Sequence, residues 1–117
     1  MLPNGLPRRA RLHLKRDFER IIQGGTRYQA SGLVLWAEQT GQTGPARFAV
    51  VVSKKLGPAV VRNRTKRFLR EAFRKNRARI KPGVNMIVSP RDSERLNTVQ
   101  ATQLAFTSLC GKAALWE

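Results

Sequence analysis

The cations between Lys54 and Arg79 are the residues of this chain best able to carry chemistry. This stretch holds 11 of the chain's 23 Lys and Arg residues and a single acid, Glu71. Helices whose charged face only contacts solvent normally carry both acidic and basic residues, because Glu–Lys pairs one turn apart stabilise them. Arginine, which outnumbers lysine here, binds phosphates through two parallel hydrogen bonds and can stack on nucleobases. The pattern therefore predicts binding to a polyanion, most simply RNA or DNA.

Residues that could catalyse a reaction are few and scattered. The one histidine, His13, is expected to be an exposed polar residue rather than a base. The one cysteine, Cys110, falls on the apolar face of a predicted helix, which favours a core thiol. Because it is the only cysteine of the sequence, an internal disulfide and a CxxC zinc site are excluded. No two acids have metal-ligand or acid–base spacing; they are Asp17, Glu19, Glu38, Glu71, Asp92, Glu94 and Glu117. We therefore expect no catalytic site and no bound cofactor in the chain itself.

The overall composition indicates one folded, strongly basic domain. The chain has 117 residues, a formal net charge of +16, a sequence pI near 11.8 and 41% hydrophobic residues. This length suffices for one domain over residues 1–117 but not for two. The apolar runs are too short to cross a bilayer, and the N-terminus lacks the apolar segment of a secretory signal. We expect a cytoplasmic protein whose charge is balanced by a partner, and charge alone leaves DNA, RNA and an anionic membrane open.

The elements that must position these residues begin with a basic arm. Residues 1–12 are rich in Pro, Gly and Arg and are expected to be mobile. A short helix is predicted over residues 15–23, with Gly24-Gly25 ending it in a left-handed cap. One strand is predicted over residues 28–38, in which Ser31-Gly32 marks a bulge.

The basic helix follows a second strand, predicted over residues 47–53. The continuous apolar run of that strand predicts a central, covered place in the sheet. Gly57-Pro58 then starts the helix, because proline fits the first helical position, and the helix is expected to end before Lys81-Pro82-Gly83. Its predicted buried face consists of Val61, Thr65, Phe68, Leu69, Ala72 and Phe73. Its polar side and flanks carry Arg62, Asn63, Lys66, Arg67, Arg70 and Arg74.

A third strand and a last helix complete the expected fold. The strand covers residues 84–89 and is closed by Pro90. Asn97 is expected to cap the last helix with Gln100 at the capping-box position, and Gly111 to end it. The buried face of this helix is predicted to be Val99, Thr102, Phe106, Leu109 and Cys110. The order α-β-β-α-β-α predicts a two-layer α/β (α+β) sandwich whose second and third strands are parallel neighbours, joined by a crossover that is right-handed by default.

Aromatic residues of the first helix and first strand offer a second possible site. Phe18, Tyr28 and Trp36 lie in these elements, and aromatic side chains beside a sheet can stack on unpaired bases. The alternative is that all three belong to the core. The spacing favours the core for Phe18 and leaves both interpretations open for Tyr28 and Trp36.

The stretch from Ser53 to Glu71 resembles the signature of the bacterial ribonuclease P protein subunit family. The matching residues are Ser53-Lys54-Lys55, Gly57, Ala59-Val60, Arg62-Asn63-Arg64, Lys66-Arg67 and Arg70-Glu71. The family pattern is also matched by Leu14-Lys15-Arg16-Asp17-Phe18, Gly24 or Gly25, the strand ending in Trp36, and Ile87-Val88-Ser89-Pro90-Arg91. The Arg-Asn-Arg motif is short alone but highly specific with its flanking Ser-Lys-Lys and Lys-Arg. Length and element order match over nearly the whole chain.

The resemblance implies both a fold and an activity. The family's sandwich has a rare left-handed β-α-β crossover, which would replace the default hand. Its members bind a large catalytic RNA that carries the active site and its Mg²⁺ ions, and the holoenzyme removes the 5′ leader from precursor tRNA. The implied partners are therefore this RNA and precursor tRNA, with no cofactor on the protein alone and no indication of a homo-oligomer.

The resemblance also implies roles for particular residues. The RNA-binding residues would be Lys54, Lys55, Arg62, Asn63, Arg64, Lys66, Arg67 and Arg70, and Arg74 joins them from the same polar side. A cleft between the first helix and the sheet would take the single-stranded leader, lined by Phe18, Ile22, Tyr28 and Trp36. Ile22 stands where the family often has a second aromatic, so apolar contact replaces stacking there.

Two other functions would also suit a basic chain. A structural ribosomal RNA-binding protein needs the charge but does not by itself call for a cleft with stacking aromatics. A self-sufficient nuclease needs clustered acids or histidines, which this sequence lacks. A ribozyme subunit explains both features, because cations offset the repulsion between two RNAs and a leader-binding cleft favours precursor over mature tRNA.

Overall fold

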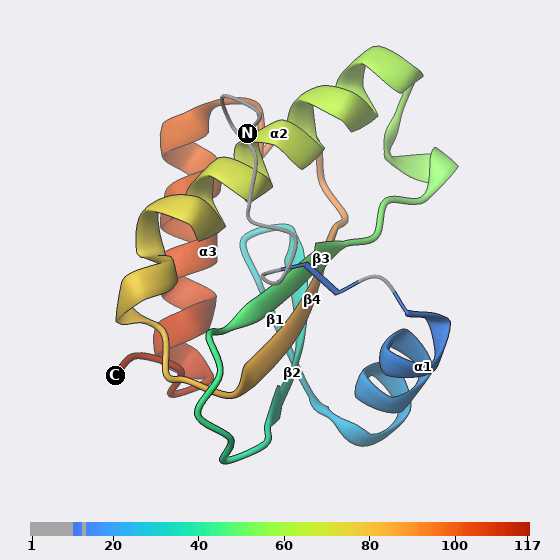
Figure 1. The fold of residues 1–117 in the computed structure, drawn as a ribbon. Coiled ribbons are helices and arrows are strands. Elements are labelled where there is room, and N and C mark those ends of the chain that lie inside the picture. The colour runs from blue at the N-terminus through green and yellow to red at the C-terminus, as the bar shows by residue number, and fades with distance from the viewer. Residues whose placement is uncertain (1–10, 13) are drawn as a thin grey trace.

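The computed structural model describes residues 11–12 and 14–117 and, within them, shows three α-helices and a four-stranded sheet (Figure 1). The elements in chain order are α1 (Lys15–Gly24), β1 (Thr26–Ala30), β2 (Leu33–Gln39), β3 (Arg47–Val50), α2 (Ala59–Asn76), β4 (Val84–Pro90) and α3 (Val99–Lys112). Two short 3-10 helices flank α2, namely η2 (Lys54–Leu56) and η3 (Arg77–Arg79). This mixed α+β fold confirms the predicted class. Residues 1–10 of the expected arm and His13 lie outside the described residues.

The strands form one sheet in the order β1-β2-β4-β3. β2 pairs with β1 and β4 in antiparallel orientation, and β3 pairs with β4 in parallel, which confirms the predicted parallel neighbours. The predicted central place of β3 is wrong, because β4 is central and β3 lies at the edge. The run of apolar residues in β3 arises because both of its faces are covered by other parts of the protein. Burial of the faces does not depend on whether a strand has one or two neighbours in the sheet. The hand of the β3-α2-β4 crossover stays a prediction.

The end of the expected arm is held against the β3 edge. Arg11 forms a parallel bridge with Phe48, and the backbone N–H of Leu12 donates to the Phe48 carbonyl at 3.0 Å. The side chain of Leu12 is buried. These two residues are therefore part of the folded domain, contrary to the expected mobile arm over residues 1–12.

The single strand predicted over residues 28–38 is a tight hairpin. Ala30 and Leu33 face each other across the two-residue turn, in which Ser31 and Gly32 have φ values of 54° and 78°. Two successive left-handed residues characterise the hairpin turn that matches strand twist. Ser31-Gly32 is thus a turn rather than a bulge, and the described part of the chain has one strand more than predicted.

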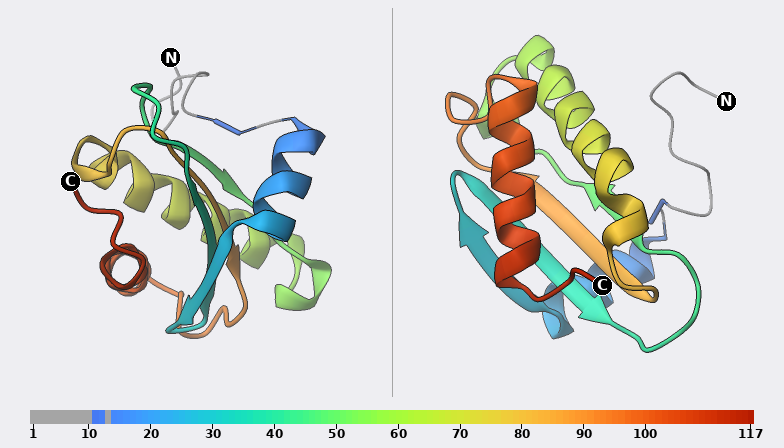
Figure 2. Two further views of the ribbon diagram at one scale, coloured as in Figure 1. Left: turned by 90° about the horizontal axis from the view of Figure 1, so that it is seen from below. Right: turned by 90° about the vertical axis from the view of Figure 1, so that its left-hand side faces the viewer.

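Helices cover both faces of the sheet (Figure 2). α2 and α3 pack on one face and build the main core, where the Phe48 and Phe73 rings stack with centroids 4.4 Å apart and Phe106 meets them edge-on. This part is the predicted sandwich. α1 packs on the other face, where Ile21 and Ile87 belong to a smaller apolar cluster. The cluster is small because α1 covers only part of that face.

The glycines after α1 act through close packing rather than through a left-handed cap. Gly25 has φ −78° and is extended, which contradicts the predicted cap. A Cβ at this position would lie 2.5 Å from the Ile21 carbonyl oxygen and 2.8 Å from that of Ala37. Glycine is required here because two backbones meet, a tertiary contact that the helix-end pattern does not reveal.

The ends of α2 and α3 differ slightly from the predicted ones. α2 begins at Ala59 with Pro58 as its N-cap residue. Thr98, not Asn97, caps α3, because its Oγ1 accepts a hydrogen bond from the Ala101 N–H at 3.0 Å. α3 continues past Gly111, and the left-handed residue after it is Ala114, with φ 57°.

Candidate nucleic-acid interface

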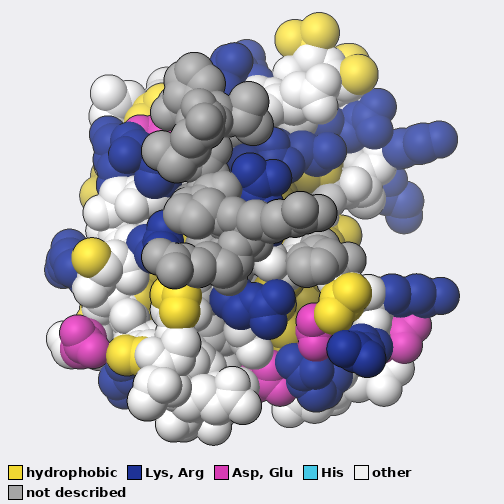
Figure 3. All heavy atoms as spheres, viewed as in Figure 1, with side chains coloured by type: hydrophobic (Ala, Val, Ile, Leu, Met, Phe, Trp, Pro, Cys, Tyr) yellow, Lys and Arg dark blue, Asp and Glu magenta, His cyan; other side chains and the backbone are white. Residues whose placement is uncertain are grey.

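α2 has the two-sided character that its sequence predicts. Thr65, Leu69, Ala72 and Phe73 are buried against the main core, whereas Val61 and Phe68 are half-buried. The cations project from the rest of the helix surface. Figure 3 shows Lys and Arg side chains gathered where α2 and the loop before it lie. Burial of one face therefore fixes the direction in which the charges point.

The loop before α2 presents Lys54 and Lys55 beside the start of the helix. Ser53 caps the short η2 turn by accepting a hydrogen bond from the Lys55 N–H at 3.1 Å. Gly57 follows with φ 153°, and a Cβ there would lie 3.3 Å from Val61 Cγ1. The Ser-Lys-Lys and Gly parts of the motif thus shape the turn and leave both lysines exposed.

The predicted RNA-binding cations of α2 are free to bind an external anion. Arg67 and Arg70 are exposed, whereas Arg62, Arg64 and Lys66 are half-buried. In the described part of the chain, none of these five has an acidic partner within 4.0 Å. Several guanidinium and ammonium groups without acidic partners on one helix are suited to binding phosphates. Asn63 is exposed among them.

Arg74 differs from the other cations on this side. Its guanidinium forms an ion pair with Glu71, one turn earlier, with Nε donating to Oε2 at 3.0 Å. This hydrogen bond lowers the pKa of the Glu71 carboxyl and raises that of Arg74. Arg74 was expected to bind RNA, but the structure gives it a partner within the helix.

The expected leader-cleft residues are divided between the two faces of the sheet. Trp36 is half-buried on the α1 face and packs, with Phe18, against the smaller apolar cluster. Ile22 lies one turn after Phe18 and is 41% exposed. Tyr28 pairs with Leu35 and packs against the main core. Because successive strand residues point to opposite faces, Tyr28 lies across the sheet from Trp36 and does not line the same cleft.

The sequence and the fold match those of known proteins. A model of the family "Ribonuclease P" matches residues 6–114. The chain belongs to the ribonuclease P protein family. The ribonuclease P protein component of Herpetosiphon aurantiacus is 37% identical over 111 residues, which cover 95% of this chain and 89% of that protein. That of Gluconacetobacter diazotrophicus is 40% identical over 92 residues, which cover 78% and 79%.

Solved structures of ribonuclease P proteins share the fold. The protein from Staphylococcus aureus aligns with a TM-score of 0.81 at 28% identity, covering 100% of this chain and 97% of that one. The protein from Thermotoga maritima aligns with a TM-score of 0.77 at 32% identity, covering 87% and 96%. The α+β architecture is therefore that of the ribonuclease P proteins.

In this member of the ribonuclease P family, a partly exposed ion network connects α1 to the sheet. Arg20 donates to both carboxylate oxygens of Glu38 in β2, at 2.7 and 2.9 Å, and to Asp17 at 2.8 Å. Asn85 in β4 also donates to Glu38, at 2.9 Å. The bond from Arg20 lowers the pKa of the Glu38 carboxyl. Sequence analysis missed this network because its members are distant in the chain.

Two further cations beside Trp36 were also missed. The Cζ atoms of Arg27 and Arg91 each lie 5.9 Å from the centroid of the Trp36 ring. Recognising the β1–β2 hairpin would have revealed Arg27, since it pairs directly with Trp36. No comparable local signal connects Arg91 to Trp36.

Groups suited to catalysis or metal binding are sparse in the described residues. There, no three His, Cys, Asp or Glu residues are grouped so that they could hold a metal ion. Cys110 is buried, and desolvation raises the pKa of its thiol to about 12, so it stays protonated at neutral pH, which confirms the predicted core thiol. None of the helices in the described ranges is long and apolar enough to span a membrane.

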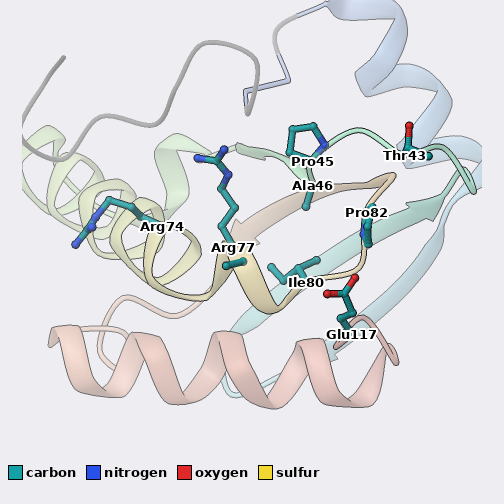
Figure 4. Close-up of a pocket in the computed structure, with 9 residues that line it drawn as sticks. Thr43, Pro45, Ala46, Arg74, Arg77, Ile80, Pro82 and Glu117 are labelled. Atoms are coloured by element: carbon teal, nitrogen blue, oxygen red, sulfur yellow. The ribbon is translucent and has the colours of Figure 1, made fainter.

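A cavity of about 480 Å³ lies at the C-terminal end of α2 (Figure 4). Arg77 extends toward Pro45 on one side, and Glu117 lies on the other. Its floor includes the buried side chains of Ala46 and Ile80. The cavity is separate from the α1 face of the sheet, and no residue of the Ser53–Glu71 motif lines it. Its connection to the motif is Arg74, which lines the cavity and forms an ion pair with Glu71.

Proposed function

We propose that this chain is the protein subunit of ribonuclease P, which binds the catalytic RNA and helps it remove the 5′ leader of precursor tRNA. The observation that carries the proposal is the group of α2 cations without acidic partners in the described part of the chain, presented by the family's own motif. A helix of 18 residues is about 27 Å long, so its polar side can follow several phosphates of an RNA partner.

The chemistry of cleavage belongs to the RNA in this proposal. The protein contributes positive charge, which reduces the repulsion between an RNA active site and an RNA substrate. The Mg²⁺ ions that assist cleavage would be held by the catalytic RNA, because the described residues hold no cluster of metal ligands. Family membership supports this division of labour.

Recognition of the leader would occur on the α1 face of the sheet. Phe18, Ile22 and Trp36 present apolar and aromatic surface there, partly open to solvent. Aromatic side chains stack on unpaired bases with little regard for sequence. Since mature tRNA has no leader, contacts at this face would favour substrate over product.

A reconstitution experiment tests the proposal. Precursor tRNA is incubated with the purified chain, with a bacterial ribonuclease P RNA, or with both, at low and high Mg²⁺ concentrations. We expect no cleavage by the chain alone and accurate 5′ cleavage at low Mg²⁺ only when both are present. Site-specific cleavage by the RNA-free chain, or no effect of the chain on the Mg²⁺ requirement of the RNA, would overturn the proposal.

A further inference from the structure

The cavity at the C-terminal end of α2 presents two opposite charges that do not meet. Arg77 extends toward Pro45 on one side, and Glu117 lies on the other (Figure 4). Within residues 11–12 and 14–117, neither side chain has a partner of opposite charge within 4.0 Å. Arg74 also lines the cavity, but Glu71 already binds its guanidinium. Arg77 and Glu117 are therefore the charged groups available to a ligand.

The wall that carries Glu117 is held in place by backbone hydrogen bonds. The Lys81 N–H donates to the Leu115 carbonyl at 2.9 Å, and the Glu117 N–H donates to the Arg79 carbonyl at 2.8 Å. These bonds tie the last residues of the chain to the segment that follows η3. The backbone of Glu117 is thus fixed beside the cavity.

The loop between β2 and β3, which contributes Pro45, forms another wall. The Gly83 N–H donates to the Gly44 carbonyl at 2.8 Å, and the Thr40 hydroxyl donates to the Gly83 carbonyl at 2.8 Å. Gly83 has φ 76°, and a Cβ there would lie 2.6 Å from the Gln42 carbonyl oxygen, so glycine allows the close approach. Both walls are therefore in place before a ligand arrives, which lowers the cost of binding.

The surface between the two charges is apolar. The buried side chains of Ala46 and Ile80 form the floor, and Pro45 and Pro82 lie beside them. The volume of about 480 Å³ falls within the range of roughly 300 to 1,000 Å³ that is typical of small-molecule sites. An apolar floor with a guanidinium on one side and a carboxylate on the other suits a flat ring that carries an anionic group and hydrogen-bond donors.

We propose that this cavity is a binding site for a nucleotide, in which Arg77 binds the phosphate and Glu117 accepts hydrogen bonds from the base. A guanidinium binds a phosphate through two parallel hydrogen bonds. A carboxylate is only an acceptor at neutral pH, so it selects a base whose edge donates. The nucleotide is either free or an unpaired residue of an RNA chain, since both present the same phosphate and base.

The carboxylate predicts an order among the bases. Guanine presents two adjacent N–H donors on its Watson–Crick edge, which match the two oxygens of Glu117. Adenine and cytosine each present one amino group. Uracil places its one N–H between two carbonyl oxygens, which a carboxylate repels. Guanosine monophosphate should therefore bind most tightly and uridine monophosphate least.

The first test is calorimetric titration of the RNA-free chain with guanosine or uridine monophosphate. The wild type should bind the guanosine nucleotide about five-fold or more tightly than the uridine nucleotide. Arg77→Gln should weaken both ligands, because it removes the phosphate contact. Glu117→Gln should weaken guanosine monophosphate about five-fold and remove the preference, because an amide also donates to uracil. No RNA is present, so the result does not depend on the proposed function.

Lys75→Gln and Glu94→Gln are the matched controls. Both side chains are exposed and neither lines the cavity, and the two changes remove one positive and one negative charge. We expect both controls to bind guanosine monophosphate with wild-type affinity. Melting temperatures of all four variants are compared so that a loss of folding is recognised.

The second test repeats the guanosine monophosphate titration with the chain bound to a bacterial ribonuclease P RNA. Binding that persists identifies a free nucleotide as the ligand. Binding that is lost, together with weaker RNA binding by Glu117→Gln, identifies an unpaired residue of the RNA. Three results would overturn the inference: equal or undetectable binding of the two nucleotides by the wild type, wild-type binding by Arg77→Gln and Glu117→Gln, or loss of binding in the complex without weaker RNA binding by Glu117→Gln.

Discussion

The cations of α2 allow a quantitative prediction, because the structure distinguishes free cations from a paired one. Arg62→Ala, Arg64→Ala and Lys66→Ala each remove a charge that has no acidic partner in the described part of the chain. If each contacts one phosphate, the slope of log affinity for the catalytic RNA against log salt should fall by roughly 0.7 to 0.9 per variant. The affinity lost between about 50 and 200 mM salt then shrinks about 2.6- to 3.5-fold per contact.

Arg74→Ala supplies the control within the same helix. It also removes one positive charge, but from a guanidinium that Glu71 already binds. We expect a smaller change in slope for this variant than for the other three. The assay is direct binding of purified protein to the catalytic RNA at five or more salt concentrations, with melting temperatures measured in parallel. Wild-type slopes for Arg62→Ala, Arg64→Ala and Lys66→Ala would show that α2 does not contact the RNA.

Three further predictions concern the cleft and the packing of α1. Trp36→Ala should weaken holoenzyme binding to precursor tRNA but not to mature tRNA. The Tyr28 side chain contacts the core, so Tyr28→Ala should lower the free energy of unfolding by roughly 1–3 kcal/mol and leave the preference for precursor tRNA intact. The opposite pattern in binding assays would contradict the assigned faces. Glu38→Gln should destabilise the protein at neutral pH. Because Arg20 lowers the pKa of the Glu38 carboxyl, the difference in stability from wild type should shrink as the pH falls from the ordinary pKa of 4.5 through the lowered pKa of the folded state. A pH-independent difference in chemical denaturation would argue against the ion pair. Gly25→Ala should cost about 1–3 kcal/mol because its Cβ meets two carbonyl oxygens, while Gly24→Ala, whose Cβ meets nothing within 4 Å, should be neutral or stabilising in thermal melts.

The arrangement of the two surfaces has a consequence for assembly. The cations of α2 and the α1 face of the sheet belong to different layers of the domain (Figure 2). One protein domain can therefore contact the catalytic RNA and the leader with separate groups of residues. Substitutions in α2 should affect both tRNA forms, because they act on the holoenzyme, whereas substitutions around Trp36 should affect only the form with a leader.

Local sequence patterns predicted the features that depend on neighbouring residues. The spacing of Leu69 and Phe73 predicted the buried face of α2, and the opposite side of that helix then had to carry the cations. The Ser53–Glu71 motif identified the family because it lies in one continuous stretch. The apolar position of Cys110 predicted an inert thiol. In each case a helical period or a short motif contains the whole argument.

Tertiary structure decided the features that depend on which strands and helices meet. β3 lies at the edge although its sequence is as apolar as that of a central strand, since both of its faces are covered. Tyr28 and Trp36 belong to opposite faces because a two-residue turn at Ser31-Gly32 makes them members of different paired strands, with Leu35 opposite Tyr28. The groups around Trp36 and Glu38 come from strands and a helix far apart in the chain. Only strand register and helix docking bring such residues together, and neither is written in the spacing of any one segment.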